Sequence, residues 1–336
     1  MNYNIMYIAA LLGTFGITVG VSKKLIPVLK SHKMGQRILE IGPRWHKSKE
    51  GTPTMGGLAF ILAAVIVGIA GSVYLAITDG IRATLPFMFT LALGLTGGLI
   101  GCVDDSAKLR KKQNEGLTAP QKFILQVVAA ALYLLGMTLV CGIDTKLFIP
   151  FFGVTIDFGI MYYVVSMILI TGIINAVNLT DGIDGLCSSV TLVVGLFFTA
   201  AGYMNGLAEP DGSTILLGAV IIGSCAGFLV YNFYPARVFM GDTGSLFLGA
   251  LVVGGSFMIG NPLLVLVFGI VYVIETASVI LQVGYFKLTH GKRLFKMSPI
   301  HHHFEKCGWS EIKIVVVASA VTLIAALLSI FFGMNG

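Results

Sequence analysis

Five clusters of polar residues interrupt an otherwise apolar chain of 336 residues. They contain the carboxylates, amides, histidines and lysines that bind hard cations and phosphate groups in proteins. The clusters are Lys47–Thr54, Asp104–Lys112, Asn175–Asp184, Asn232–Asp242 and Ser298–Glu305. If the chain folds so that they meet beside a membrane, we expect a site for metal and phosphate chemistry there.

The second cluster begins with two adjacent carboxylates, Asp104 and Asp105, which are followed by Lys108. Neighbouring negative charges at a membrane edge repel each other, and a bound cation or a role as a base would account for them. A solvated helix end with Lys108 as the partner one turn later explains this motif equally well.

The third cluster places Asn175, Asn178, Asp181 and Asp184 at intervals of three residues. A continued helix would put them on one face, whereas nearby glycines indicate that the helix ends near Asp181. A polar turn between two spans is the simpler alternative. Four amide or acid groups without a basic residue exceed what a turn needs, so we favour ligand binding.

The fourth cluster ends at Asp242, which lies between Gly241 and Gly244. Glycine allows the backbone to approach a ligand closely, and the N–H groups at the start of the next helix favour phosphate. Taken alone, this pattern more often marks a helix N-cap. Beside the other clusters, Asp242 can provide a carboxylate for a cation such as Mg²⁺.

The fifth cluster contains His301, His302 and His303 inside the chain, which argues against a purification tag. A zinc site is a poorer alternative, because consecutive helical residues cannot all point at one ion. Phosphate contacts by one or two of the histidines are the better interpretation. Glu275 lies within an apolar segment, and its position alone does not separate a functional role from a structural hydrogen bond.

The elements that position these clusters are expected to be membrane helices. The chain is 56% hydrophobic and 11% charged, with mean hydropathy +0.90, whereas soluble domains carry about 25% charged residues. About 20 apolar residues cross a bilayer. Ten segments qualify: 3–21, 55–77, 84–102, 121–140, 160–177, 186–204, 213–231, 244–260, 262–283 and 313–333. The sequence predicts an all-α integral membrane protein with ten transmembrane helices in one polytopic domain, 1–336.

The basic residues predict the orientation of these helices. With both termini extracytoplasmic, the inner loops hold all but Arg82 and Lys146 of the 22 lysines and arginines. Because basic residues mark cytoplasmic loops, the expected active site lies on the cytoplasmic face. The inner loops are about 22–54, 103–120, 178–185, 232–243 and 284–312. On the outer side, 141–159 is expected to form a small hairpin.

Several other features limit the function. Lys23 and Lys24 follow the first apolar segment instead of preceding it, which favours a retained helix over a cleaved signal. The net charge of +6 suits an anionic membrane lipid surface and anionic substrates. The basic residues show no nucleic-acid recognition motif, so we expect no nucleic acid partner. Five scattered cysteines indicate neither disulfides nor zinc.

Taken in order, four segments resemble the phospho-N-acetylmuramoyl-pentapeptide transferase family over essentially the whole chain. They are DDSAKLRKK (104–112), NAVNLTDGIDGL (175–186), FMGDTGSL (239–246) and PIHHHFE (299–305). The wider superfamily of polyprenyl-phosphate N-acetylhexosamine-1-phosphate transferases shares the aspartate motifs. PIHHHFE and GTPTMGG (51–57) point to the muramoyl-pentapeptide branch.

The resemblance implies a reaction. UDP-N-acetylmuramoyl-pentapeptide would donate its phospho-sugar to undecaprenyl phosphate, giving lipid I and UMP during peptidoglycan synthesis. The implied cofactor is Mg²⁺, and the implied location is the inner (cytoplasmic) membrane of a bacterium. The sequence leaves open whether the protein is a monomer or a homodimer.

The resemblance also implies roles for residues. Asp242 matches a metal-binding aspartate, and one of Asp104 and Asp105 matches a proposed base acting on the lipid phosphate. With His301, these are the candidate catalytic residues. The candidate substrate-binding residues are Lys49, Thr54, Lys108, Asn178, Leu179, Asp181, Gly182, Asp184, Asn232, Phe239, Gly241, His302 and His303, with Phe239 stacking on uracil.

Two other functions stay open at the level of sequence. A sister enzyme would transfer N-acetylglucosamine 1-phosphate to a polyprenyl phosphate, and turnover with each UDP-sugar separates the two. A transporter would also have many spans, and uptake into proteoliposomes would reveal it. Transporters place ligand groups near the membrane midplane, whereas these polar clusters are predicted at one face.

Overall fold

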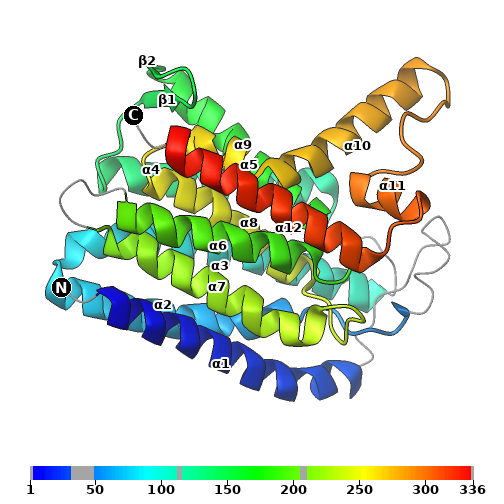
Figure 1. Cartoon of the computed structure of the whole chain (residues 1–336), viewed down its shortest axis with the longest axis horizontal. Coiled ribbons are helices and arrows are strands. Elements are labelled where there is room, and N and C mark those ends of the chain that lie inside the picture. Colours follow the sequence, from blue (N-terminus) through cyan, green and yellow to red (C-terminus); the bar gives the residue numbers. More distant parts are fainter. Residues whose placement is uncertain (1–2, 32–48, 112–115, 205–209, 334–336) are drawn as a thin grey trace.

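The computed structural model describes residues 3–31, 49–111, 116–204 and 210–333 as a bundle of long helices with one small sheet (Figure 1). The long helices are α1 (Tyr3–Ser31), α2 (Gly57–Thr78), α3 (Ile81–Lys111), α4 (Ala119–Leu139), α5 (Met161–Thr180), α6 (Leu186–Met204), α7 (Gly212–Asn232), α8 (Gly241–Met258), α10 (Ile270–Leu288) and α12 (Glu311–Leu328). The shorter elements are β1 (Lys146–Ile149), β2 (Val154–Asp157), η2 (Pro262–Leu264), α9 (Val265–Phe268), α11 (Ile300–Lys306) and η3 (Ser329–Gly333).

Nine helices in these ranges are long and apolar enough to cross a membrane. They are the long helices other than α8, whose first turn carries Asp242 and other polar residues. The protein is therefore a largely helical, multi-pass membrane protein. A tenth span at 244–260 and two extracytoplasmic termini stay predictions.

α3 is longer than its apolar segment suggested. The predicted span ends at 102, but the helix continues through Asp104 and Asp105 to Lys111. After Ser106 come Ala, Lys, Leu and Arg, and all four are good helix formers that prolong the helix where hydropathy signals an end. The two aspartates therefore lie on a helix and not in a loop.

Between α8 and α10 the chain is broken twice. Pro262 begins a single 3₁₀ turn, and Gly269 separates α9 from α10. The span predicted at 262–283 is displaced as a result, because the long helix there covers Ile270–Leu288. Figure 1 shows α10 leaving the bundle obliquely.

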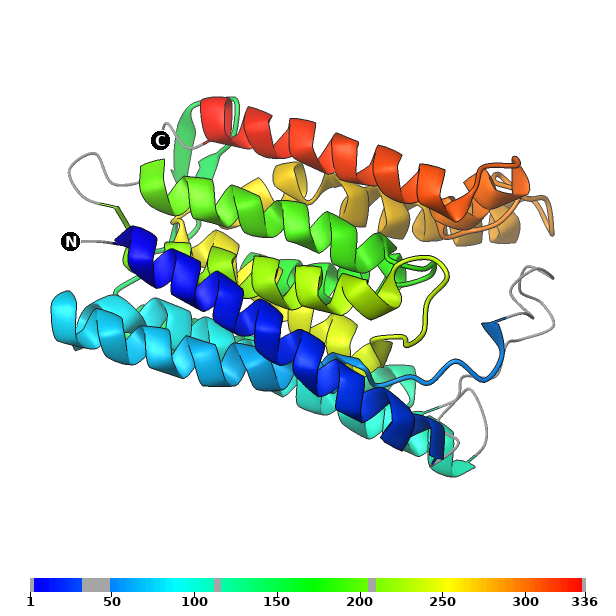
Figure 2. The same ribbon diagram turned by 60° about the horizontal axis from the view of Figure 1, so that its bottom comes forward.

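The two ends of the bundle differ in character. The predicted hairpin is confirmed, with β1 and β2 paired antiparallel so that Lys146 faces Asp157. It lies at the end where α1 begins and α12 ends (Figures 1 and 2). The turns with the polar clusters lie at the opposite end. Residues 32–48 and 112–115 of the predicted inner loops are outside the described residues. The assignment of this end to the cytoplasm stays a prediction.

α8 occupies the centre of the bundle, and its side chains from Thr243 to Phe257 are buried. α3 packs against it through small residues, because a Cβ atom at Gly97 would lie 2.8 Å from a carbonyl oxygen of α8. A Cβ atom at Gly101 would overlap the carbonyl group of Asp242. Small residues allow such close backbone approach between membrane helices. The last turns of α3 are thereby brought against the first turn of α8.

Candidate active site

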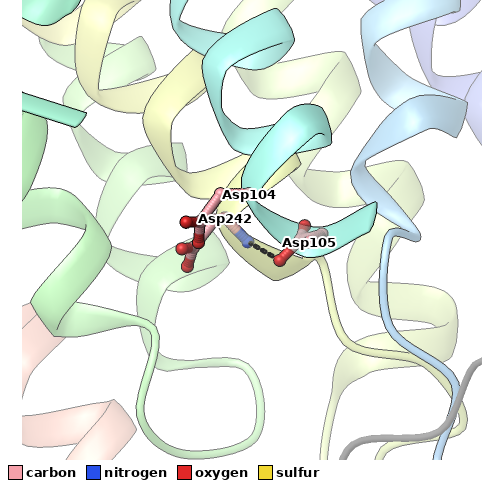
Figure 3. Close-up of side chains that lie close together, drawn as sticks. All are labelled: Asp104, Asp105 and Asp242. Carbon is pink, nitrogen blue, oxygen red and sulfur yellow. Dashed lines mark hydrogen bonds between the residues drawn. The ribbon is translucent and has the colours of Figure 1, made fainter. Parts of the chain in front are cut away.

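Three carboxylates meet where α3 ends beside the start of α8 (Figure 3). Asp104, Asp105 and Asp242 each offer a carboxylate oxygen, and these atoms all lie within 4.8 Å of one another. Asp104 and Asp105 are buried, and Asp242 is partly buried. Grouping three carboxylates away from water is unfavourable unless cations or hydrogen bonds compensate for it.

Two lysines supply part of that compensation. Lys108 Nζ lies 2.7 Å from Asp104 Oδ2 and 2.8 Å from Asp242 Oδ2. Lys122, in the first turns of α4, lies 2.8 Å from the same oxygen of Asp242. Three carboxylates and two ammonium groups leave an excess of negative charge when all are ionised. The cluster can therefore accept a further cation.

Asp105 holds the start of α8. The backbone N–H groups of Asp242 and Thr243 donate to its carboxylate at 3.3 and 2.9 Å, and the Thr243 hydroxyl donates at 2.7 Å. The Met240 N-cap of α8 makes no side-chain cap bond, so Asp105 performs this role from another helix. Gly241 has φ +71°, and a Cβ atom there would crowd Asp105 Oδ2 at 2.5 Å. Asp105 is thus tied to the start of α8, whereas Asp104 faces Lys108 with Oδ2 and accepts the N–H of Leu117 with Oδ1 at 2.7 Å.

The turn after α5 completes this side of the cluster. Asn178 donates through Nδ2 to Asp242 Oδ1 and to Ser245 Oγ, at 2.8 Å each. Asp181 ends the helix, as the glycines had indicated, and makes no side-chain hydrogen bond within the described parts of the chain. Loss of hydration raises the pKa of Asp181 to about 8, and the charges of Asp242 and Asp105 act in the same direction. Leu179 is partly buried beside it.

Asp184, a little further along, is fixed by an ionic network. Its Oδ1 lies 2.7 Å from Lys49 Nζ, and its Oδ2 accepts the N–H of Ala236 at 2.8 Å. Lys49 also lies 2.7 Å from Glu311 Oε2, at the start of α12. The same oxygen of Glu311 accepts the N–H of Asp184 at 2.9 Å.

His301 is buried against this turn and is oriented by an acid from α10. Its Nδ1 lies 2.9 Å from Glu275 Oε2. Its Nε2 is buried and has no hydrogen-bond partner among the described residues. A Cβ atom at Gly182 would overlap this Nε2 atom, so only glycine allows the ring to lie here. The intramembrane acid therefore orients the histidine toward the turn.

The other two histidines face different partners. His302 Nδ1 lies 2.6 Å from Glu305 Oε2. His303 Nδ1 accepts the N–H of Lys296 at 3.1 Å, and its Nε2 lies 3.7 Å from Cys307 Sγ. The rings of His301 and His302 lie 4.2 Å apart between their centroids, but the three histidines bond to different partners.

The segments before α2 and before α8 run side by side next to the cluster. Gly56 donates its N–H to the Phe239 carbonyl at 2.9 Å, and Phe239 donates to the Pro53 carbonyl at 2.8 Å. Thr54 is buried between them, and the ring of Phe239 is partly exposed. Asn232 is buried. Its Nδ2 donates to the Val238 carbonyl at 3.0 Å, and its Oδ1 accepts from the Ser188 hydroxyl at 3.2 Å.

Comparison with known proteins identifies the family of this chain. Residues 87–260, just over half of the chain, match the family model described as Glycosyl transferase family 4. Residues 49–61 match Phospho-N-acetylmuramoyl-pentapeptide-transferase signature 1. The phospho-N-acetylmuramoyl-pentapeptide-transferase of Clostridium acetobutylicum is 45% identical over 305 residues, covering 90% of this chain and 92% of the relative. That of Heliobacterium modesticaldum is 46% identical over 313 residues, with 92% of each chain covered.

That of Staphylococcus aureus is 41% identical over 321 residues, covering 95% of this chain and 97% of the relative. The chain belongs to the phospho-N-acetylmuramoyl-pentapeptide transferase family. It is therefore a transferase, which confirms the resemblance and decides against a transporter.

In this transferase, the structure groups the residues that the sequence singled out into two sets. One set surrounds the three aspartates directly and comprises Lys108, Asn178 and Gly241. The other set holds the turn after α5 and comprises Lys49, Asp184 and His301. His303 bonds to Lys296, and Asn232 bonds to Val238 and Ser188, instead of to residues of either set.

Sequence reasoning missed two residues that the structure brings to the candidate site, Lys122 and Glu311, and singled out a third, Glu275, without a partner. Lys122 lies near the N-terminus of α4, where a positive charge opposes the helix dipole, and that mismatch was the available signal. Glu275 stood out as an intramembrane acid, but nothing connected it with His301. Glu311 looked like an ordinary acidic residue in the first turn of a helix, and no local signal predicted its contacts.

Proposed function

We propose that the protein transfers phospho-N-acetylmuramoyl-pentapeptide from its UDP-linked donor to undecaprenyl phosphate, releasing UMP and forming lipid I for cell wall biogenesis. The observation that supports this most directly is the cluster of Asp104, Asp105 and Asp242, which is contacted by Lys108 and Lys122. It occurs in a chain of the transferase family that is named for this phospho-sugar. Phosphoryl transfer depends mainly on positioning and on electrostatic stabilisation, and such a cluster can provide both.

The three carboxylates fit a hard divalent cation, and we propose Mg²⁺ with Asp242 as its main ligand. Oxygen ligands that lie within 4.8 Å of one another suit this ion, which is usually held by one or two carboxylates and by substrate phosphates. When bound, Mg²⁺ would neutralise charge on the donor diphosphate. Lys108 and Lys122 already reach Asp242, so they are placed to share the phosphates with the metal.

The remaining residues suggest how the two substrates are held. Asp105 is committed to the start of α8, so Asp104 is the better candidate to accept a proton from the lipid phosphate during direct attack. Asn178, Leu179 and Asp181 line the turn beside the cluster and are proposed to bind the donor. Phe239 is partly exposed and is proposed to stack on uracil.

The other residues proposed to contribute to substrate binding, directly or through their neighbours, are Lys49, Thr54, Gly182, Asp184, Asn232, Gly241, His302 and His303. The buried arrangement of His301 supports a part in the reaction through its Nε2, which has no partner in the parts of the chain that the structure describes. We place the enzyme in the inner membrane of a bacterium, with this end of the bundle in the cytoplasm.

Release of UMP tests the proposal. Purified protein in detergent should release UMP from UDP-N-acetylmuramoyl-pentapeptide only when undecaprenyl phosphate and Mg²⁺ are both present. UDP-N-acetylglucosamine is the matched alternative donor. Equal or faster turnover with that donor would contradict the muramoyl assignment, and UMP release in the presence of EDTA would contradict the metal.

A further inference from the structure

Glu311, the first residue of α12, makes two contacts that local structure does not explain. Its Oε2 lies 2.7 Å from Lys49 Nζ and accepts the backbone N–H of Asp184 at 2.9 Å. The Glu311 side chain is only 9% exposed and that of Lys49 is 14% exposed. Glu311 thus joins Lys49, before α2, to Asp184, in the turn after α5. These two residues are 262 and 127 positions away from Glu311 in the chain.

A purely local role at the start of α12 does not account for this placement. An acid in the first turn of a helix interacts favourably with the helix dipole, but α12 already has its cap. Ser310 accepts the N–H of Lys313 at 3.3 Å. The carboxylate of Glu311 turns instead toward Lys49 and Asp184.

The network leaves Lys49 little capacity to bind an anion directly. Its ammonium group lies between the carboxylates of Asp184 and Glu311, at 2.7 Å from each. One positive and two negative charges would repel rather than attract the phosphates of a donor. Any effect of Lys49 on the donor therefore has to pass through the position of Asp184 and its turn.

We propose that Glu311 is a positioning residue for donor binding, acting through Lys49 and the backbone of Asp184. It fixes the turn Asp181–Gly185 so that Asp181 and Asn178 keep their places beside Asp242. This inference rests on the proposed function for the identity of the donor. Glu311 lies beyond residues 87–260, so the shared glycosyl transferase match does not include it.

A double-mutant cycle in the full-length enzyme tests this role. Glu311→Gln keeps the size of the side chain and removes its charge, and Lys49→Met removes the ammonium group. Loss of charge-assisted hydrogen bonds should raise the KM for the UDP-linked donor about tenfold. The kcat and the KM for undecaprenyl phosphate should change by less than about twofold. The double variant should be no worse than Lys49→Met alone, because both act through one unit.

Glu50→Gln is the matched control, since Glu50 adjoins Lys49 and its side chain is exposed. It should leave all kinetic constants unchanged. Glu311→Asp retains the charge but is shorter, and an intermediate donor KM is expected. It replaces Glu311→Gln if that variant does not fold.

Three results would overturn the positioning role. The first is a normal donor KM in Glu311→Gln. The second is multiplication of the two single effects in the double variant, which would mean that Lys49 acts on the donor independently. The third is a lower thermal midpoint with equal changes in both KM values, which indicates a structural role alone. Failure of the proposed function would appear separately, as an inactive wild-type enzyme.

Discussion

At the scale of single residues, the site depends on side chains whose partners come from distant parts of the chain. The sequence identified Asp104, Asp105 and Asp242 by their type and by their place at the ends of apolar segments. It could not divide their roles, because the division arises from which atoms meet. Asp105 accepts two backbone N–H groups of α8, whereas Asp242 meets two lysines.

Asp242→Asn should lower turnover by about 10²-fold or more, the scale observed when one transition-state electrostatic group is removed. The change preserves size and removes the charge that Lys108, Lys122 and a metal would share. Asp79→Asn, an exposed position at the opposite end of the bundle, is the control. Initial rates of UMP release at limiting Mg²⁺ measure the effect, and near-normal activity would refute the metal assignment.

Gly182→Ala should reduce kcat by about tenfold or more, because the new methyl group overlaps Nε2 of His301 and must displace the ring. Gly172→Ala is a matched control, since a Cβ atom at Gly172 of α5 meets nothing within 4 Å. The kcat of UMP release, measured for both variants, tests this expectation. If they behave alike, the close approach of His301 to this turn has no part in the reaction.

The raised pKa of Asp181 predicts how stability changes with pH. The pKa is about 8 in the folded enzyme, against about 3.9 in an unfolded chain. Below the lower value the carboxyl is protonated in both states and has no effect. As pH rises toward about 8, the unfolded state releases the proton first, so the carboxyl destabilises the fold progressively. Asp181→Asn should therefore raise the thermal midpoint at pH 9 and have no effect near pH 3.5. A difference that is independent of pH would contradict this.

At the scale of elements, hydropathy predicted the existence of the long helices better than their ends. It ended α3 at 102 because apolar residues stop there, while the helix continues to Lys111 through residues of good helix propensity. It also could not show that the glycines of α3 face α8. That fact depends on how two helices pack, and a single segment does not reveal it.

Gly97→Ala should destabilise the bundle, because its methyl group would lie 2.8 Å from the Leu246 carbonyl oxygen and must push α3 from α8. Overpacking of this kind costs about 1–3 kcal/mol. Gly20→Ala on α1 is the control, as open space surrounds its Cβ position. Thermal midpoints in detergent measure the effect. Equal midpoints for both variants would show that the close approach of α3 and α8 is not needed.

At the scale of the whole molecule, the sequence predicted that the polar clusters would gather at one end, and the described loops do so (Figures 1 and 2). The prediction succeeded because membrane helices are antiparallel rods, so alternate loops share a side. The sequence could not predict the ion pairs and hydrogen bonds between those loops. Contacts such as Lys122 with Asp242, or Glu311 with Asp184, depend on the lateral order of the helices.

The orientation of the whole molecule in the membrane can be tested by labelling native cysteines. Cys307 is exposed at the end that carries the site, whereas Cys187 and Cys225 are buried. In an enzyme that keeps only Cys307, a membrane-impermeant maleimide should label inside-out vesicles and should not label intact spheroplasts. Lys146→Cys in a cysteine-free chain is the opposite control, because this hairpin residue is exposed at the other end. The reverse pattern of labelling would invert the orientation that the lysines and arginines predict. It would also place the aspartate cluster on the side of the membrane away from cytoplasmic UDP-linked donors.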